Sequence, residues 1–487
     1  MGRPDSLRRL AAAVLWCAAG AHTAPELLRD LPLHHFPASR QTQTDAQGFY
    51  SMPTAIGDDY FDGTSPLSRV EHDLETARRG GAAYLRCAFS WNGIEKEQGQ
   101  YDWTFWDSLV KLAEQNRIKL IPYVAYPPRW AVRQEKDFWK QPPRDPRLYG
   151  DFMYRIASRY RGRIAAWEIW NEPDNREYWT GTADEFAALA RLAARRIREA
   201  DPNAVVVLGG MANGPSAFFK RLIGKDHMDR DVDVVAMHAY PETWSNERAE
   251  ALFAEWIPAM SEAIARDRSG ADLWLNEMGY ADYRFRPNQA SVYGYDVFYS
   301  YEHTPAYQAA MLFKFEVMAL ASGRVSLTGW YRADDFPSSE TRLGNDLVNY
   351  HLGLTDTKGQ PKPVLRALGF FHNLLGGRTR LMKAKLDRAA GSQSVADLFQ
   401  RADGELIAVA WLRSSLPGEV SQYSGMLQDR RSEEISIELP CAHPALEGAF
   451  DPEGRRVSSG ARVAGDILEG IELRGGQVFV GKIGCRP

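Results

Sequence analysis

Short apolar strands alternate with amphipathic helices through most of this 487-residue chain, and this alternation constrains the fold more than any other feature. Val70, Leu74 and Ala77 recur at helical spacing, and residues 82–89 then read as a strand. Similar pairs follow up to a helix that ends near Leu375. Such alternation predicts a parallel sheet with right-handed crossovers, and roughly 300 residues of it fit a (β/α)8 TIM barrel.

The pattern changes near residue 378. Residues 378–487 contain short alternating strands separated by glycine-containing turns, which predict an antiparallel β-sandwich domain. We therefore expect the barrel over residues 65–377 and the sandwich over residues 378–487. Residues 22–64 mix proline, histidine and polar residues with short apolar pieces, so we expect an irregular segment there. The position of the first barrel strand stays open.

The first 21 residues are typical of an export signal. Three arginines precede an apolar run over residues 10–20, which is too short to span a bilayer and is followed by a small-residue cleavage site. We expect residues 1–21 to be a signal peptide and the protein to be periplasmic or secreted. No later segment is apolar for long enough to predict a transmembrane helix.

Charge and cysteine usage exclude several classes of function. The net charge is −4, and no basic cluster predicts a nucleic-acid partner. None of the four cysteines has the spacing of zinc ligands, so we expect neither a metal nor a cofactor. Cys441 and Cys485 both lie near the end of the chain and could pair in an oxidising compartment. The oligomeric state stays open.

One predicted strand ends abruptly at a polar pair. Residues 164–170 are mostly apolar and aromatic, Asn171 and Glu172 follow, and Pro173 stops the strand. A carboxyl at the C-terminal end of a barrel strand is well placed for chemistry. Its aromatic neighbours should desolvate it and raise its pKa, as a general acid requires.

A second carboxyl ends a strand about 100 residues later. Residues 271–275 form a short apolar run, and Asn276-Glu277 follows it. By itself this second pattern is only a weak indication of a catalytic carboxyl. Its spacing from Glu172 strengthens that indication. Two carboxyls at the mouth of one barrel are the groups that a glycosidase needs.

These two motifs resemble those of clan A of the glycoside hydrolases. The resemblance covers roughly residues 65–370 and is strongest in the Trp-Asn-Glu-Pro element at Glu172. It implies a retaining O-glycosyl hydrolase in which Glu172 is the acid/base at the end of strand four and Glu277 is the nucleophile at the end of strand seven. The run is most similar to the family 39-like branch of xylosidases, iduronidases and exopolysaccharide glycosidases.

That resemblance implies a carbohydrate substrate, and we expect a polysaccharide or oligosaccharide such as a bacterial exopolysaccharide. A tyrosine-rich insertion at residues 281–304 follows the second carboxyl and predicts an open cleft with several sugar subsites. Two alternatives remain: an endo-glycanase of the cellulase or mannanase kind, and a non-catalytic glycan-binding protein on the same fold. The sandwich either binds glycan or braces the barrel, and bracing is the favoured interpretation.

The resemblance also implies a set of substrate-binding residues. Asn171 would hold the sugar 2-hydroxyl, and His238 would contact the bound sugar. Tyr240 would hydrogen-bond the nucleophile, and Arg86 would lie beside it and favour its ionised form. For His238 and Tyr240 the alternative is a core role at the end of a strand, and for Arg86 it is a structural ion pair.

Three aromatic side chains complete the predicted site. Trp330 ends the eighth strand and resembles the platform on which the reactive sugar stacks, with a core tryptophan as the alternative. Tyr126 and Trp179 are candidate walls of the sugar subsites. Glu168 shares strand parity with Glu172, so it should also face into the barrel, where Arg86 would be its partner.

Overall fold

The structure of the protein is a computed structural model that describes residues 44–60, 63–212, 214–241, 249–266, 270–282, 304–335, 351–414 and 429–485. The expected signal peptide at residues 1–21 lies outside these residues. So does most of the tyrosine-rich insertion at 281–304. Among the described helices, none is long and apolar enough to cross a membrane.

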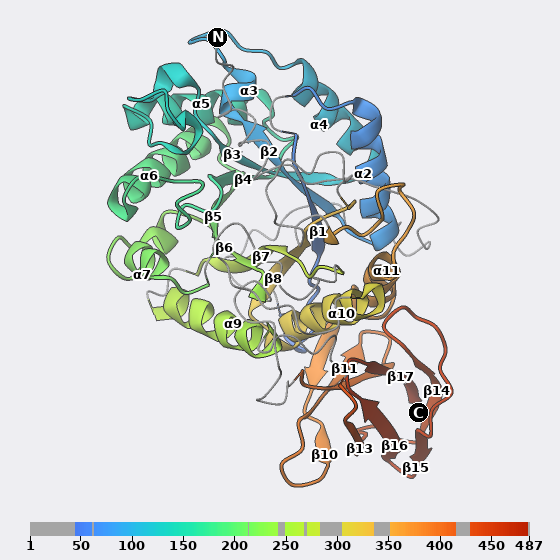
Figure 1. The fold of residues 1–487 in the computed structure, drawn as a ribbon. Helices are drawn as coiled ribbons and strands as arrows, with labels where there is room; N and C mark the ends of the chain where they lie inside the picture. The colour runs from blue at the N-terminus through green and yellow to red at the C-terminus, as the bar shows by residue number, and fades with distance from the viewer. Residues whose placement is uncertain are drawn as a thin grey trace, which may run out of the picture.

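Eight parallel strands close into a barrel and confirm the predicted fold (Figure 1). They pair in sequence order, and β1 closes the ring against β8 through the register Thr54↔Thr328. The strands are β1 (Thr54–Asp58), β2 (Tyr84–Ser90), β3 (Lys119–Ala125), β4 (Ala166–Ile169), β5 (Val205–Met211), β6 (Val234–Ala239), β7 (Asp272–Met278) and β8 (Val325–Trp330).

Helices surround the barrel and cover the outer face of its strands. They are α2 (Leu67–Gly80), α3 (Trp91–Ile94), α4 (Thr104–Asn116), α5 (Pro146–Arg159), α6 (Ala183–Ala200), α7 (Ala217–Gly224), α9 (Ala249–Arg266), α10 (Pro305–Ser322) and α11 (Pro363–Leu375). Local sequence sets their ends. In α6, for example, Thr182 and Glu185 form a capping box that satisfies the first free backbone N–H groups.

The barrel begins earlier than residue 65, so the predicted boundary was wrong. Strand β1 lies inside the segment 22–64 that we expected to be irregular. The strand is only five residues long and contains Gly57, which weakens the usual strand signal. The structure explains the glycine, because a Cβ at Gly57 would lie 2.4 Å from the Tyr331 ring.

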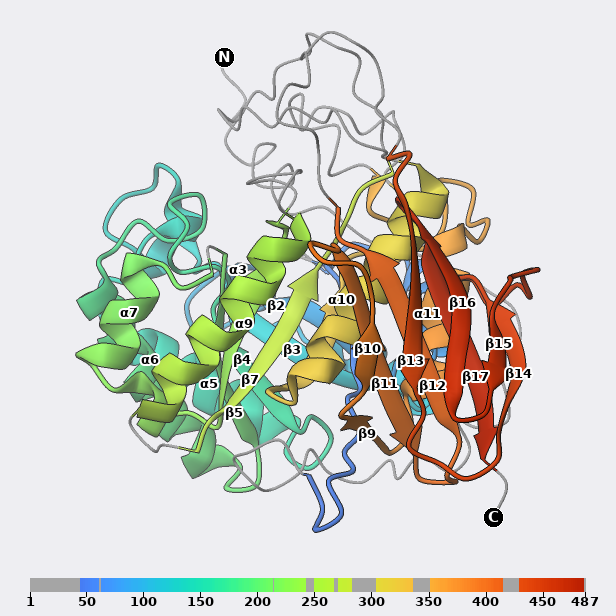
Figure 2. The same cartoon turned by 90° about the horizontal axis from the view of Figure 1, so that it is seen from below.

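The C-terminal region forms two antiparallel sheets, as predicted (Figure 2). One sheet has the order β10-β13-β16-β15 and the other β14-β17-β12-β11-β9. The strands are β9 (Thr379–Met382), β10 (Lys385–Asp387), β11 (Ser394–Arg401), β12 (Leu406–Leu412), β13 (Ser432–Glu438), β14 (Pro444–Phe450), β15 (Arg462–Ala464), β16 (Ile467–Arg474) and β17 (Val478–Cys485). Their facing side chains form a hydrophobic core separate from that of the barrel.

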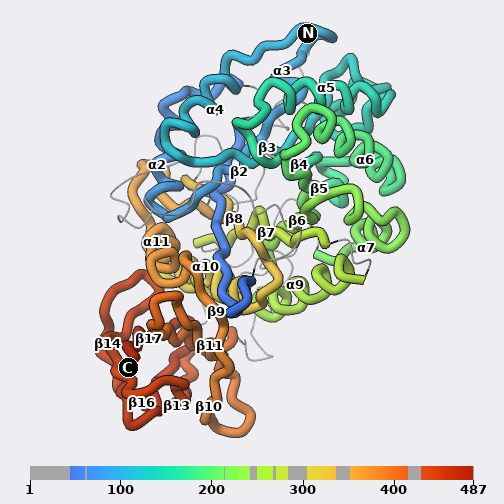
Figure 3. Tube along the Cα trace, turned by 180° about the vertical axis from the view of Figure 1, so that it is seen from behind, coloured from blue at the N-terminus to red at the C-terminus, as the bar shows by residue number. Residues whose placement is uncertain are grey.

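Buried polar contacts join the sandwich to the barrel. Glu250 of α9 accepts hydrogen bonds from Lys314 Nζ of α10 at 2.7 Å, and from Trp411 Nε1 and Ser414 Oγ at 2.9 and 2.6 Å. The segment before β1 also pairs with β9, and Figure 3 shows the two side by side. A buried carboxylate with these partners fixes two surfaces together, which fits the bracing interpretation of the sandwich.

The disulfide between Cys441 and Cys485 confirms the expected pairing and should stabilise the sandwich. The two Cα atoms lie 5.9 Å apart, and the bond joins residues 44 positions apart in the chain. The chain-entropy model gives about 4 kcal/mol for a loop of this length. We expect the double variant Cys441→Ser/Cys485→Ser to lose that much unfolding free energy in guanidinium titrations. An unchanged midpoint would show that the bond contributes no stability.

Candidate active site

A break in β4 presents Glu172 at the mouth of the barrel. The strand ends at Ile169, and both Trp170 and Glu172 have positive φ angles, at 71° and 44°. Non-glycine residues adopt this left-handed conformation when their surroundings hold them there. The Glu172 N–H donates to Gly210 O at 3.1 Å, which anchors the turn to β5. The sharp turn thus fixes the Glu172 carboxyl just beyond the C-terminal end of β4.

Glu277 approaches from β7, a strand that is buried over its whole length. Tyr240 Oη donates to Glu277 Oε1 at 2.8 Å, and Arg86 Nη1 donates to Glu277 Oε2 at 2.5 Å. Both contacts agree with the prediction. Each oxygen of the Glu277 carboxyl therefore has a hydrogen-bond donor that fixes its orientation.

The two glutamates face each other. One oxygen of Glu172, one oxygen of Glu277 and a ring nitrogen of His238 all lie within 4.8 Å of one another. Both glutamates are about 9 % exposed, so each carboxyl is almost buried yet reaches the surface of the mouth. Two carboxyls at this separation can act on opposite sides of a single bond.

Burial raises the pKa of Glu172 to about 7, as the aromatic surroundings predicted. A hydrogen bond from Asn175 Nδ2 to Glu172 Oε2 at 2.9 Å and the positive charge of Arg86 act in the opposite direction and are weaker. A carboxyl with this pKa is protonated in a large share of molecules at neutral pH. Glu172 therefore has the electrostatics of a general acid.

Arg86 is the centre of the polar network beneath the two carboxyls. It donates to Glu168 through Nε at 2.7 Å and through Nη2 at 2.9 Å. It also donates from Nη2 to Asn171 Oδ1 at 2.8 Å, in addition to its bond with Glu277. The predicted pairing of Glu168 with Arg86 inside the barrel is confirmed. Burial lowers the pKa of Arg86, but the two carboxylates outweigh it and raise the pKa well above its usual value.

His238 contacts the Glu172 carboxyl and is fully buried. Its Nδ1 lies 2.9 Å from Glu172 Oε1 and 3.6 Å from Glu277 Oε1. A Cβ at Gly210 would lie 2.2 Å from His238 Nε2, so the glycine makes room for the ring. The contact with a bound sugar that we expected is not supported by this position. Burial lowers the pKa of His238, which favours the neutral ring.

The structure corrects the expected role of Trp330. Thr328 bonds to Glu316 of α10, so it faces the helices, and Trp330 two residues later shares that side. Trp330 is fully buried, and its Nε1 donates to Leu352 O at 3.1 Å. The next residue, Tyr331, faces the mouth instead, with its ring centroid 6.5 Å from that of Tyr240.

Trp179 is also a core side chain, and the expected subsite wall was wrong. It is buried, and its ring centroid lies 5.0 Å from that of Trp170. Tyr126 does reach the site, because its hydroxyl lies 3.5 Å from Asn171 Nδ2. Of the three aromatic side chains expected to contact the sugar (Trp330, Tyr126 and Trp179), Tyr126 is the one that lies beside the polar network.

Asp59, which directly follows β1, was not among the residues predicted from the sequence. Its carboxylate accepts from Tyr123 Oη at 2.6 Å and from Tyr331 Oη at 2.9 Å. Burial raises the pKa of Asp59 to about 7. A carboxyl at the end of a barrel strand was the signal that identified Glu172, and it would have identified Asp59 had β1 been recognised.

Among the residues that the structure describes, two groups of side chains have a spacing that suits metal ligands, and a positively charged side chain contacts each group. Arg86 contacts the group formed by Glu172, His238 and Glu277. In the second group, Asp282, Asp335 and His351, Lys362 Nζ lies 3.1 Å from Asp282 and 2.8 Å from Asp335. A cation that the chain already supplies replaces a metal ion in each group. The donor sets therefore do not fit a metal cofactor.

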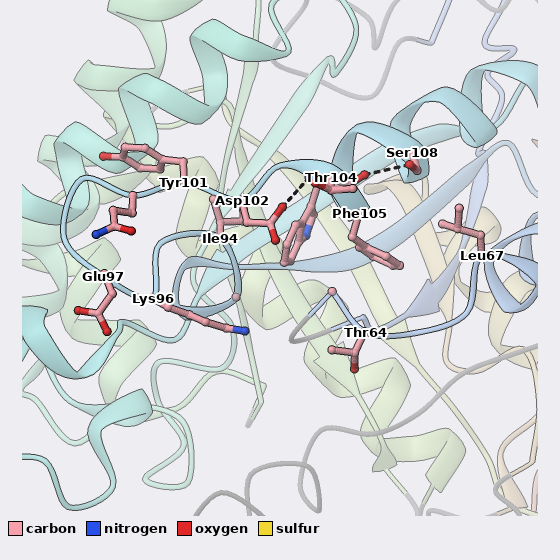
Figure 4. A pocket seen from close by; sticks show the side chains of 14 residues that line it. Thr64, Leu67, Ile94, Lys96, Glu97, Tyr101, Asp102, Thr104, Phe105 and Ser108 are labelled. Atoms are coloured by element: carbon pink, nitrogen blue, oxygen red, sulfur yellow. Dashed lines mark hydrogen bonds between the residues drawn. The ribbon is translucent and has the colours of Figure 1, made fainter.

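Figure 4 shows a cavity of about 610 Å³, and neither Glu172 nor Glu277 lines it. Its lining comes from the loop that leads into α2, from residues 93–102 and from the start of α4. Tyr101 lines it but offers no free ring, because Trp103 stacks on it at 5.6 Å and Arg155 lies 4.6 Å from its ring centroid. No predicted site residue lines this cavity, so we do not identify it as the active site.

Comparison with solved structures shows that this fold occurs among glycoside hydrolases. A family 39 glycoside hydrolase from Bacteroides cellulosilyticus WH2 is 12% identical, with a TM-score of 0.64 over 89% of this chain and 81% of that chain. A monomeric beta-xylosidase from Caulobacter crescentus CB15 is 17% identical, with a TM-score of 0.61 over 90% of this chain and 96% of that chain.

Comparison of sequences gives the family. A beta-xylosidase from Caldicellulosiruptor saccharolyticus is 26% identical over 259 residues, which are 49% of each chain. The match thus spans about half the length of this curated relative. The pattern of the family described as glycosyl hydrolases family 39 matches residues 45–440, which include both strand-end glutamates. The chain belongs to glycosyl hydrolases family 39.

Proposed function

We propose that this protein is a retaining β-glycoside hydrolase. The observation that carries the proposal is the approach of the Glu172 and Glu277 carboxyls, which have oxygens within 4.8 Å of each other. Retaining glycosidases have carboxyl groups roughly 5–5.5 Å apart, whereas inverting enzymes need roughly 6.5–9.5 Å to admit a water molecule. The different surroundings of the two groups support different roles.

In the first step, a Glu277 carboxylate oxygen attacks the anomeric carbon as the glycosidic bond breaks. The leaving oxygen takes the proton of Glu172, and the sugar stays bound to Glu277 as an ester. In the second step, Glu172 takes a proton from water, whose oxygen attacks the same carbon and releases Glu277. Two displacements at one carbon retain its configuration.

For the substrate, we propose a β-linked polysaccharide or oligosaccharide, with a bacterial exopolysaccharide as the first choice. The tyrosine-rich sequence after β7 supports an extended glycan. The names of relatives favour a second candidate, a β-xyloside or xylan, because they include a beta-xylosidase and an endo-1,4-beta-xylanase. An endo-glycanase of the cellulase or mannanase kind and a non-catalytic glycan-binding protein are the remaining alternatives.

A substrate panel tests this proposal. Purified protein would be incubated with aryl β-glycosides of several sugars, with xylan and mannan, and with bacterial exopolysaccharides, and new reducing ends would be measured. We expect release of reducing ends from at least one polymer at a higher rate than aryl monoglycosides are cleaved. Faster cleavage of aryl xylosides would favour the xylosidase candidate. Binding without cleavage on the whole panel would contradict a hydrolase.

We also propose that the protein acts in the periplasm or outside the cell. The Cys441–Cys485 disulfide supports this location, because such bonds persist in oxidising compartments. The apolar run at residues 10–20 supports export. Fractionation of the producing cells, followed by mass spectrometry of the mature N-terminus, tests both points.

The pH dependence should follow Glu172. Glycosylation needs the protonated form, so we expect kcat/KM to fall as pH rises through about 7, the pKa of Glu172. The Asn175 amide stabilises the ionised form, so Asn175→Ala should raise this pKa and move the alkaline limb to higher pH. A pH–rate profile of both proteins on one aryl glycoside measures the shift. An unmoved limb in the variant would assign the limb to another group.

A further inference from the structure

Glu168 occupies the most completely bonded position beneath the two catalytic carboxyls. It is fully buried on β4, and it accepts two hydrogen bonds from Arg86, at 2.7 and 2.9 Å. It also accepts from the Gly210 N–H at 3.0 Å and from Asn276 Nδ2 at 2.9 Å. All these partners are donors. The surroundings of Glu168 therefore match a carboxylate and no uncharged side chain.

Arg86 shares its charge between Glu168 and Glu277. Its Nε faces Glu168, its Nη1 faces Glu277, and its Nη2 bonds to both Glu168 and Asn171. Arg86 is itself about 1 % exposed, so water offers it little compensation. A buried cation that loses a carboxylate partner is costly.

We propose that Glu168 is a positioning residue that keeps the charge of Arg86 compensated while Glu277 carries the sugar. This inference rests on the proposed function. When Glu277 attacks, its oxygen forms a bond to the anomeric carbon and its negative charge is lost, while Glu172 gives its proton to the leaving oxygen and becomes the anion. Arg86 then faces a neutral ester on one side. Glu168 remains as its ionised partner through a bidentate contact.

The two chemical steps should respond differently when Glu168 loses its charge. Arg86 would then keep Glu277 but not Glu168 as a carboxylate partner, which stabilises the Glu277 carboxylate before the attack. In the covalent intermediate, neither Glu168 nor Glu277 would then carry a charge opposite to that of Arg86. Glycosylation should therefore become slower. Deglycosylation regenerates the Glu277 carboxylate, so it should not slow to the same extent. A residue that only supports the fold would not separate the steps in this way.

The first test is Glu168→Gln, studied by rapid-mixing kinetics with 2,4-dinitrophenyl β-D-xyloside or with the dinitrophenyl glycoside that the wild-type protein cleaves fastest. We expect the glycosylation rate and kcat/KM to fall at least about 10-fold, the lower end of the loss known for hydrogen-bond partners of metal ligands, with a smaller fall in deglycosylation. Any burst of dinitrophenol seen with the wild type should disappear. An equal fall in both steps, or no fall, would overturn the inference.

Glu316→Gln is the matched control. Glu316 is also fully buried, but it lies on the outer side of the barrel and accepts from the Thr328 and Thr54 hydroxyls. Burial raises its pKa to about 8, so it is mostly protonated at neutral pH and an amide resembles it. We expect wild-type rates for both steps in this variant. Equal losses in the two variants would mean that any buried acid affects the steps alike.

A second measurement needs no substrate. Removal of a negative charge beside Arg86 leaves more of its positive field on Glu172, so the pKa of Glu172 should fall in Glu168→Gln. A ¹³C NMR titration of the glutamate carboxyls measures this, and an unchanged pKa would contradict the shared charge. If the wild-type protein cleaves no glycoside, the proposed function fails. The titration still decides whether Glu168 compensates the positive charge of Arg86.

Glu168→Asp covers the case in which the Gln variant does not fold. This variant keeps the negative charge but moves it away from Arg86 by the length of one methylene group. Glycosylation should therefore again slow more than deglycosylation, but less than in Glu168→Gln. Rates equal to the wild type in both steps would show that the position of this carboxylate is unimportant. An equal loss in both steps would indicate a role in the fold alone.

Discussion

Glu277→Gln should abolish glycosidase turnover while the protein stays folded. Loss of a catalytic nucleophile commonly costs about 10⁴-fold or more in kcat. The amide is nearly the same size as the carboxyl, so β7 should keep its place. The measurement is the steady-state rate on the best glycoside of the panel, together with a thermal melt. Retention of wild-type rates would show that Glu277 is not the nucleophile.

Azide distinguishes the two possible assignments of the glutamates. In Glu277→Gly, azide should enter the space left by the side chain and attack the anomeric carbon directly, giving the α-glycosyl azide from a β-glycoside. If Glu277 were instead the acid/base, azide would attack a glycosyl-enzyme and give the β-azide. The anomer of the product, read by proton NMR, separates the roles. Glu316→Gln should behave as wild type and controls for the loss of a buried acid.

Glu172→Gln should have a large effect that depends on the leaving group. Proton transfer of this kind contributes about 10²–10⁴-fold, so we expect a loss in that range for natural glycosidic bonds. An aryl glycoside with a strongly acidic phenol needs no protonation, so its glycosylation should be almost unaffected. Deglycosylation still lacks its base. The covalent intermediate should therefore accumulate on such a substrate.

A comparison of two aryl glycosides checks this prediction. With 2,4-dinitrophenol as the leaving group, the variant should show a burst followed by slow turnover, and azide should restore turnover as the β-azide. With an unactivated phenol, the first step itself should be slow. Equal losses on the two substrates would mean that Glu172 does not protonate the leaving group.

The central parts of the fold could be predicted because their signals are local. The alternation of strands and helices has a fixed period, and the Trp-Asn-Glu-Pro element places a carboxyl at a strand end without knowledge of the rest of the chain. Strand parity placed Glu168 inside the barrel and the family resemblance placed Arg86 near Glu277, and the structure confirms the contact between Glu168 and Arg86. Cys441 and Cys485 were candidates for pairing because both lie near the end of the chain.

The errors arose where position depends on tertiary structure. Trp330 and Tyr331 are adjacent aromatics at the end of β8, and the sequence does not state which of them faces the mouth. That depends on strand register, which places Thr328 against Glu316 of α10 and Trp330 on the same side of the strand. Trp179 lies in a loop whose packing onto Trp170 carries no periodic signal. Strand β1 was missed because five residues with a glycine are too few to define a period.

Trapping of the covalent intermediate tests the central claim most directly. A 2-deoxy-2-fluoro glycoside with a dinitrophenol leaving group slows both steps and lets the glycosyl-enzyme accumulate, and peptide mass spectrometry then locates the sugar. The account predicts one added sugar on the peptide that contains Glu277, and none in Glu277→Gln. A sugar on another residue would contradict it, as would a substrate that wild-type protein cleaves with inversion and without any labelled peptide.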